Sequence, residues 1–159
     1  MELRNTPKLT ALPVEHLCDW FVRFSDVHLL QTPLGRRVIV TVAGGEVAGP
    51  RLRGRVLPGG MDWVLTGTDD VGRIAVRATL ETHDGALVLM TNQGRTWLPP
   101  EAAERFSSGQ NVTTDEMYAR STPLFETGDA RYAWLNKTVC LAVNELSMQG
   151  VNYRVYQVL

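Results

Sequence analysis

The stretch GGEVAGPRLRGRVLPGGMDW, residues 44–63, packs six glycines and two prolines into twenty residues. Glycine adopts backbone conformations closed to other residues and lets a second backbone come close, so glycines inside strands mark bulges and sharp bends. From position 51 to 56, arginines alternate with apolar residues or glycine, which is the period of a β-strand. The stretch therefore predicts short strands folded tightly on one another, ending in a Pro-Gly-Gly turn at 58–60 that presents Asp62 and Trp63. The simplest role of each glycine is to bend the wall of a barrel.

Further strands are expected on both sides of this stretch. Residues 73–82 (RIAVRATLET) alternate cleanly between an apolar and a polar face, and His83-Asp84-Gly85 after them is typical of a hairpin turn. Residues 15–30 also show strand period, although a helix with Leu17, Trp20, Phe21 and Phe24 on one face is the alternative. Other runs with strand character are residues 37–43, 61–66, 86–92, 122–128, 137–146 and 151–159.

About eight to ten short strands with turn signals between them and little helix are typical of an all-β, antiparallel barrel or sandwich. We expect one domain over residues 1–159, with an irregular N-terminal arm at 1–14. A long polar loop is expected at 95–116, with a single helical turn near 100–106 and a helix start at 114–117.

Composition argues against several classes of partner. The net charge of −1 gives no electrostatic attraction to nucleic acid or to an anionic membrane. No apolar run is long enough for a membrane span or a signal peptide, so we expect a cytoplasmic protein. Two cysteines make no disulfide framework, and the three histidines show no metal-ligand spacing. No phosphate loop or GxSxG motif is present, so we expect neither a metal nor a cofactor.

Four blocks carry a family resemblance: GGEVAGPRLRGRVLPGGMDW, THDGALVLMTNQG (82–94), TPLFETGDARYAWLNK (122–137) and VNYRVYQV (151–158). They resemble, in the same order, the DUF3237 family, also called UPF0311, and the resemblance runs from about residue 14 to 158. It implies an antiparallel β-barrel like those of calycins and lipocalins. It also implies a homodimer as a common state, in a family whose members mostly lack an assigned function.

A barrel of this size holds one small ligand among its inward side chains, in a mostly apolar pocket with a few polar groups. Asp62 and Glu126 are the predicted acid and base. A carboxyl held in an apolar pocket has a raised pKa and exchanges protons near neutrality. In the alternative, Asp62 caps the turn or pairs with Arg77, and Glu126 faces solvent.

Tyr132 and Asn136 are the predicted groups that polarise a substrate oxygen. Trp134 lies between them and either stacks on a flat ligand or plugs one end of the barrel. Arg77 and Arg120 either hold a carboxylate or phenolate, or form internal salt bridges. The residues predicted to bind the ligand are Trp63, Arg77, Glu81, Asn92, Arg120 and Trp134.

These residues favour a cofactor-independent enzyme of isomerase, cyclase, hydratase or lyase type, acting by proton transfer on a hydrophobic, aromatic or polyketide-like small molecule. The fold part of this hypothesis is analogy. A non-catalytic carrier or sensor of such a molecule is the first alternative. A barrel with a filled interior, working through its surface, is the second.

Overall fold

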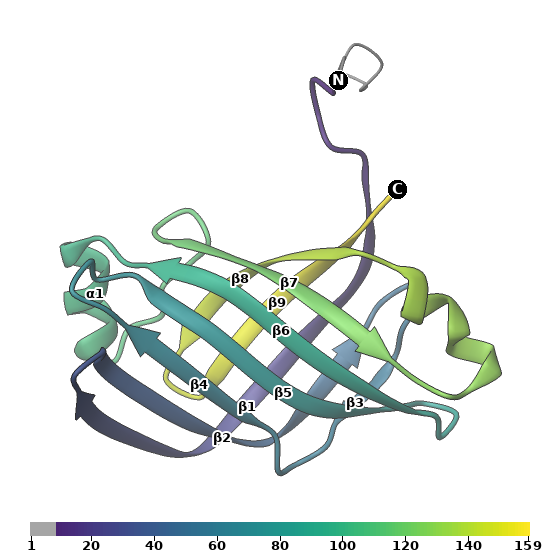
Figure 1. Cartoon of the computed structure of the whole chain (residues 1–159), viewed down its shortest axis with the longest axis horizontal. Coiled ribbons are helices and arrows are strands. Elements are labelled where there is room, and N and C mark those ends of the chain that lie inside the picture. Colours follow the sequence, from purple (N-terminus) through teal and green to yellow (C-terminus); the bar gives the residue numbers. More distant parts are fainter. Residues whose placement is uncertain (1–8) are drawn as a thin grey trace.

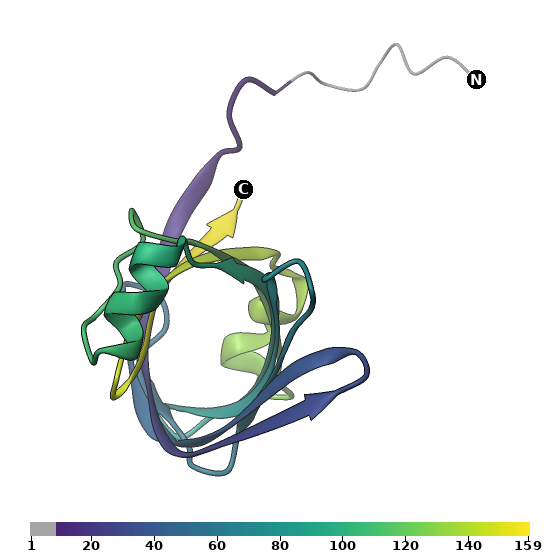
Figure 2. The same ribbon diagram turned by 90° about the vertical axis from the view of Figure 1, so that its left-hand side faces the viewer.

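The computed structural model describes residues 9–159, whose strands form one antiparallel sheet closed into a barrel (Figures 1 and 2). The sheet closes because β1 pairs with β2 along one edge and with β9 along the other. The predicted all-β, antiparallel fold is confirmed. The nine strands of the described residues are β1 (Val14–Thr32), β2 (Gly35–Ala48), β3 (Gly54–Val56), β4 (Met61–Thr66), β5 (Gly72–Thr82), β6 (Leu87–Trp97), β7 (Tyr118–Glu126), β8 (Cys140–Ser147) and β9 (Gly150–Val158).

The glycine-rich stretch contains the end of β2 and the short strands β3 and β4, which follow one another between β2 and β5. The predicted folding of its strands on one another is confirmed for its first half, because Gly45 and Val47 of β2 pair with Val56 and Gly54 of β3. The end of β2 pairs with β3, the start of β2 pairs with β4, and both short strands also pair with β5. The turn at 58–60 interrupts them and is held by β2, because the Val42 N–H donates to the Gly60 carbonyl at 2.8 Å. Asp62 and Trp63 therefore enter β4 directly after the turn.

Strand alternation separates the inner from the outer face of the barrel. On β5, Ile74, Val76, Ala78 and Leu80 are buried, as the sequence predicts, whereas Arg77 is exposed. The inward side chains of all the longer strands meet in one apolar cluster, and Trp20 is its largest fully buried member. Burying each large apolar side chain contributes roughly 1.5–3 kcal/mol, so this interior cluster is the main source of stability.

Two glycines let β2 and β9 approach β1 from opposite sides at the same point. A Cβ at Gly45 would lie 1.9 Å from the Phe21 carbonyl oxygen, and a Cβ at Gly150 would lie 1.9 Å from the Val22 carbonyl oxygen. Neither space admits any side chain. The closure of the barrel at the middle of β1 therefore depends on these two positions being glycine.

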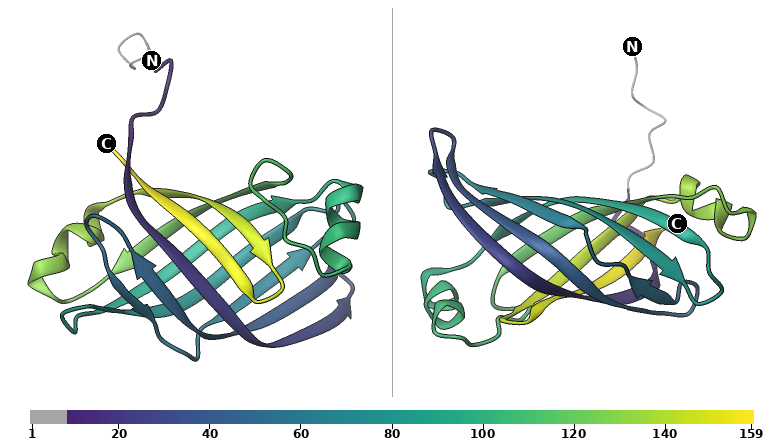
Figure 3. Two further views of the ribbon diagram at one scale, coloured as in Figure 1. Left: turned by 180° about the vertical axis from the view of Figure 1, so that it is seen from behind. Right: turned by 90° about the horizontal axis from the view of Figure 1, so that it is seen from below.

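The two helical segments lie at opposite ends of the barrel (Figures 1 and 3). The 3-10 helix η1 (Ala130–Lys137) sends Tyr132 and Leu135 into the interior cluster and so plugs one end. At the other end, α1 (Pro100–Ser107) takes part in a small second cluster of Ala102, Val112, Met117 and Ala119.

The long loop expected at 95–116 is shorter than predicted. β6 continues to Trp97, because its residues keep pairing with β5 and β7, and α1 occupies much of the remainder. The helix start predicted at 114–117 is wrong, since these residues form a turn that leads into β7. The strand predicted for 15–30 is confirmed, and the helical alternative is wrong. Of the arm predicted at 1–14, residues 1–8 lie outside the described part, and β1 begins at Val14.

β1 and β2 run on beyond β9 as a hairpin that projects from the ring of strands (Figure 2). β9 pairs with β1 only as far as Arg23, so the rest of β1 pairs with β2 alone among residues 9–159. Val27, Leu29 and Leu34 on this hairpin are exposed. Such an edge is where a second copy of the chain would find unpaired main-chain groups. The homodimer stays a prediction.

We expect Gly45→Ala to lower the free energy of unfolding by at least about 2 kcal/mol, because β2 must move away from β1 to admit the methyl group. Urea unfolding midpoints measure this loss. Gly128→Ala is the matched control, since a Cβ at Gly128 meets no atom within 4 Å, and we expect a change of less than about 0.5 kcal/mol. Equal midpoints for the two variants would contradict the role assigned to Gly45.

Candidate functional site

The inner wall of the barrel carries a small set of polar side chains among apolar ones. Asp62 on β4 lies in register with Val40 and Val76, both of which are buried in the interior. Asn92 lies in register with Val76 on the next strand. Ser121 on β7, Asn144 on β8 and Tyr153 on β9 are also buried on the inward-facing positions of their strands.

Asp62 is the one ionisable carboxyl on this wall among the described residues. Its side chain stands in the ladder between β4 and β5, where the Ala75 N–H donates to Oδ1 at 3.1 Å. Burial raises the pKa of Asp62 from 3.8 to about 6, and the N–H groups of Ala75 and Trp63 partly oppose the shift. A carboxyl with this pKa is both a base and an acid near neutral pH.

Several buried polar atoms on the interior side have no hydrogen-bond partner within residues 9–159. Asn92 is the extreme case, because its side chain is 1% exposed and neither its Nδ2 nor its Oδ1 has a partner. Nearly all buried polar groups in folded proteins are paired, so the unpaired Asn92 amide is an unfavourable feature of this interior. The other such atoms are Trp20 Nε1, Thr96 Oγ1, Ser121 Oγ and Asn144 Oδ1.

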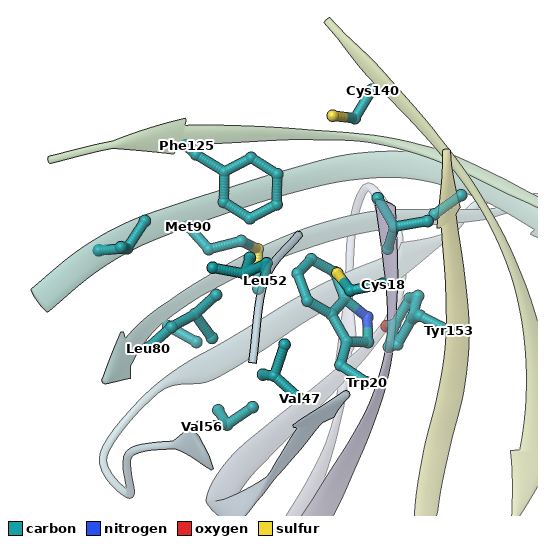
Figure 4. Packing of buried hydrophobic residues seen from close by; sticks show 14 of the residues in the cluster. Cys18, Trp20, Val47, Leu52, Val56, Leu80, Met90, Phe125, Cys140 and Tyr153 are labelled. Carbon is teal, nitrogen blue, oxygen red and sulfur yellow. The ribbon is translucent and has the colours of Figure 1, made fainter. Parts of the chain in front are cut away.

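Three aromatic rings lie together in this interior (Figure 4). Trp20 meets Tyr153 edge-on with ring centroids 5.5 Å apart, and it meets Phe125 in the same way at 5.9 Å. Burial raises the pKa of Tyr153, and the charge of Asp62 raises it further, so the two groups share one electrostatic environment. The Tyr153 hydroxyl and the Trp20 indole N–H are hydrogen-bond donors within this interior.

Of the residues predicted from the sequence, Asp62 and Asn92 are on this wall, whereas Glu126 is not. Glu126 is exposed on the outer face of β7, because strand alternation turns Phe125 inward. It lines an outer groove of about 400 Å³ together with Asn136. The interior position considered for Glu126 is therefore corrected to the solvent-facing one.

The arginines predicted to hold a ligand also lie outside the barrel. Arg77 is exposed, and Arg120 is exposed over the ring of Tyr118 at 5.3 Å. Glu81 forms an ion pair with Arg55 on the outer face. Trp63 is 45% exposed. These four assignments are corrected for one reason: each residue has the outward parity of its strand.

The three residues predicted in η1 belong to the plug. The Asn136 side chain forms two hydrogen bonds with the main chain of Thr127, as a paired strand would. Its Oδ1 accepts from the Thr127 N–H at 2.8 Å, and its Nδ2 donates to the Thr127 carbonyl at 2.9 Å. The Tyr132 hydroxyl donates to Asp84 at 2.9 Å. Trp134 packs against the interior cluster and lies under the guanidinium of Arg51 at 4.0 Å. The plug alternative for Trp134 describes it correctly, and Tyr132 and Asn136 have structural partners.

Sequence reasoning missed Trp20, Ser121, Asn144 and Tyr153. Alternation along β9 puts Tyr153 and the charged Arg154 on opposite faces of the strand, and this pattern could have identified Tyr153 as a buried residue. For Ser121 and Asn144 the signal is weaker, because a small polar residue in an alternating strand is as compatible with the outer face. Their inward direction follows from the folded barrel, in which each side chain is only 3% exposed.

A groove of about 520 Å³ lies on the outer face of β1, β8 and β9. It is lined mainly by outward residues, and the charges of Asp19 and Arg154 at its edge pair with each other at 2.9 Å. It gathers none of the unpartnered amides, so we do not take it as the reactive site.

Within residues 9–159, no helix is long and apolar enough to cross a membrane. The same part of the chain holds no group of three His, Cys, Asp or Glu side chains suited to a metal ion.

A family model described as "Protein of unknown function (DUF3237)" matches residues 13–158. A UPF0311 protein of Rhodopseudomonas palustris is 33% identical over 125 residues, which cover 79% of this chain and 82% of the relative. Its crystal structure matches at 30% identity with a TM-score of 0.89, over 95% of this chain and 100% of the other.

Two further solved structures share the fold. A beta-barrel like protein from Acinetobacter baumannii is 29% identical with a TM-score of 0.81, over 98% of this chain and 100% of that one. A protein described as an enzyme from Penicillium herquei has a TM-score of 0.70 over 97% of this chain and 99% of its own. At 20% identity, the second likeness is one of fold alone.

We expect Asp62→Asn to stabilise the protein at pH 7 by about 3 kcal/mol. The pKa of Asp62 is higher in the folded state than in the unfolded chain. Ionisation of Asp62 above this pKa therefore lowers the free energy of unfolding. Stability is therefore greatest below the ordinary pKa of 3.8 and is lost as pH rises through about 6. The advantage of the variant should vanish below pH 4. Urea midpoints between pH 4 and pH 8 measure it.

Asp69→Asn is the control for this pH series. The pKa of Asp69 is lowered to about 2, chiefly by its hydrogen bonds from Arg73. Removing its charge should therefore bring no gain at pH 7. A stability difference between wild type and Asp62→Asn that does not depend on pH would contradict the raised pKa of Asp62.

We expect Asn92→Val to raise the free energy of unfolding by about 1 kcal/mol, because an unpartnered buried amide pays its desolvation cost with no bond in return. Asn136→Val is the matched control. It removes two hydrogen bonds to the Thr127 main chain and should lower stability by about 1 kcal/mol or more. Thermal unfolding measures both, and a destabilised Asn92→Val would mean that the protein itself satisfies this amide.

Proposed function

The chain belongs to the DUF3237 family, and we propose that it is a cofactor-independent enzyme that transfers protons within a hydrophobic small molecule bound inside the barrel. The family assignment agrees with the resemblance drawn from the four sequence blocks. The family description names no activity, so the reaction is argued from the interior wall alone. The one observation that carries the proposal is Asp62, a carboxyl with a pKa near 6 among apolar and unpartnered polar side chains.

Asp62 is the proposed acid and base. A general base works best when its pKa lies near the working pH, because it is then ionised enough to accept a proton and acidic enough to return it. In the proposed step, the Asp62 carboxylate takes a proton from carbon next to a substrate carbonyl, and the electron pair of that C–H bond moves onto the carbonyl oxygen. Return of the proton to a different carbon gives an isomer. Departure of a leaving group from the neighbouring carbon gives an elimination.

The developing negative charge on oxygen needs hydrogen-bond donors. Tyr153 Oη, Trp20 Nε1 and Asn92 Nδ2 supply donors from three strands of the same interior, and donors held rigidly in a water-poor site are worth more than in solution. These groups replace Tyr132 and Asn136 in the role proposed from the sequence, because those two are engaged in the plug. Glu126, on the outer face, takes no part in this proposal.

The aromatic and apolar lining supports a hydrophobic, ring-containing substrate. Trp20, Phe125 and Tyr153 offer ring edges and faces on one side, and Met90 lies in the same cluster (Figure 4). The Penicillium herquei protein, described as an enzyme, supports a catalytic reading of this barrel at the level of fold only. Because the unpartnered amides would serve a carrier equally well, a non-catalytic binding protein is the second candidate.

Deuterium exchange on a simple carbon acid tests the proposal. We expect the protein to accelerate exchange of the C1 protons of 2-tetralone in D2O, measured by mass spectrometry, with a half-maximal rate near pH 6. Asp62→Asn should lose about 100-fold of the acceleration, since general bases contribute at least that factor. Asp69→Asn, on the outer surface, should keep the full rate.

Three outcomes would count against the enzyme. Full exchange by Asp62→Asn would remove Asp62 from the chemistry. Binding of 2-tetralone without exchange, seen as a shift in thermal unfolding, would favour the carrier. Neither binding nor exchange would favour a barrel with a filled interior.

A further inference from the structure

β7 has an open edge beside a groove on the outer face of the barrel. Within residues 9–159, β8 pairs with β7 only at Arg120 and Ser121, although β7 runs on to Glu126. The outer groove of about 400 Å³ lies along this unpaired part of β7, and its lining includes Leu135 and Asn136 of η1. The groove therefore lies where the ladder of the barrel wall is interrupted.

The hydrogen bonds of Asn136 show which main-chain groups face this gap. Its side chain bonds both the N–H and the carbonyl of Thr127, so the main chain of Thr127 faces η1 rather than β6. Main-chain groups alternate in direction along a strand, so those of Pro123 and Phe125 face the same side. Pro123 has no N–H to offer, which leaves Phe125 with a donor and an acceptor on the open edge. The Phe125 ring belongs to the interior cluster, so Phe125 lines the groove with its main chain.

We infer that this groove is a docking site for an extended peptide of a partner protein, which adds to the open edge of β7 as a short strand. In strand addition, main-chain hydrogen bonds supply affinity and alternate side chains supply specificity. The peptide residue opposite Phe125 donates to its carbonyl and accepts from its N–H. This surface lies outside the barrel, so the inference goes beyond the proton transfer proposed for Asp62 and does not depend on it.

Apolar side chains flank the open edge on its outer face. Leu124 on β7 is 53% exposed, and Leu89, which lies opposite Glu126 on β6, is 40% exposed. Both line the groove. Covering exposed apolar surface at an open strand edge stabilises the complex, so the peptide carries an apolar residue beside Leu124.

The charge of the groove defines the chemistry of the partner. Glu126 is the one charged side chain in the lining, and within residues 9–159 it forms no ion pair. Opposite charges on neighbouring strands attract and like charges repel. The peptide therefore carries Lys or Arg opposite Glu126, and Asp or Glu at that position is disfavoured.

Two blocked peptides test the inference. Acetyl-Ser-Thr-Lys-Val-Leu-Thr-Ser-amide, running antiparallel to β7, places Lys opposite Glu126, Val opposite Phe125 and Leu opposite Leu124, and the second peptide has Glu in place of Lys. We expect the Lys peptide to bind the whole protein with a Kd of about 1 mM or tighter, at least about threefold more tightly than the Glu peptide. NMR titration of isotope-labelled protein measures both. Hydrogen exchange of the Phe125 amide should be fast in the free protein and slowed by the Lys peptide.

Charge reversal and a backbone change separate specific docking from general stickiness. Glu126→Lys should invert the preference, so that the Glu peptide binds more tightly. Glu104→Lys is the matched control, because it makes the same change of charge on the exposed face of α1 and should keep the wild-type preference. Methylation of the valine nitrogen in the Lys peptide removes the donor to the Phe125 carbonyl and should weaken binding about fivefold.

Four results would overturn the inference. They are absence of binding by both peptides at about 1 mM, equal binding of the methylated and unmethylated Lys peptides, a preference for the Lys peptide that survives Glu126→Lys, and a protected Phe125 amide in the free protein. Analytical ultracentrifugation adds a further check. A wild-type dimer that the Lys peptide dissociates would make the occupant a second copy of the chain, and it would overturn the assignment to a separate partner.

Discussion

The barrel depends on a close contact between the backbones of three strands, β1, β2 and β9, at the middle of β1. Gly45 on β2 and Gly150 on β9 leave no room for a Cβ beside the carbonyls of Phe21 and Val22. The sheet closes through this contact, and closure gives every strand a concave and a convex face. Trp20 and Val22 lie on the concave face as a result, and the aromatic cluster forms around Trp20. A barrel so closed keeps open edges where β1 runs on past β9 and where β7 continues beyond its short pairing with β8 at Arg120 and Ser121.

Two polar side chains in the interior lower the stability of the fold. An apolar barrel would need no Asn92, whose amide is buried without a partner, and no Asp62, whose ionised form is penalised by burial. Natural proteins keep such unfavourable groups chiefly at functional sites, where a bound molecule returns the lost interactions. The exterior differs, since Arg73, Arg131 and Arg154 each form an ion pair with a neighbouring carboxylate.

Sequence reasoning recovered more of the fold than of the site. Alternation in 73–82 identified the buried face of β5, and the glycine-rich stretch located the turn before Asp62. Loop boundaries were less accurate, since β6 extends to Trp97 through pairing on both sides that no local signal shows. At the site, Asp62 and Asn92 were identified, whereas Glu81, Glu126, Arg77 and Arg120 were predicted as site residues although they lie on the outer face. These residues were chosen because charged side chains can bind ligands or transfer protons, whereas the direction of each side chain was not known from the sequence.

The sequence by itself determined that this chain is an all-β, antiparallel protein with strands of period two, and which residues of each strand share a face. Its patterns fitted a barrel or a sandwich, and the family resemblance implied the barrel. It separated Phe125 from Glu126 and Tyr153 from Arg154. Only the tertiary structure decided which of the two faces is concave, and which strands adjoin. Asp62 and Tyr153 are far apart in the chain and share one environment because the sheet closes. The physical reason is that alternation is a local property of the backbone, whereas burial and the pKa of Asp62 depend on strands that come together only when the barrel forms.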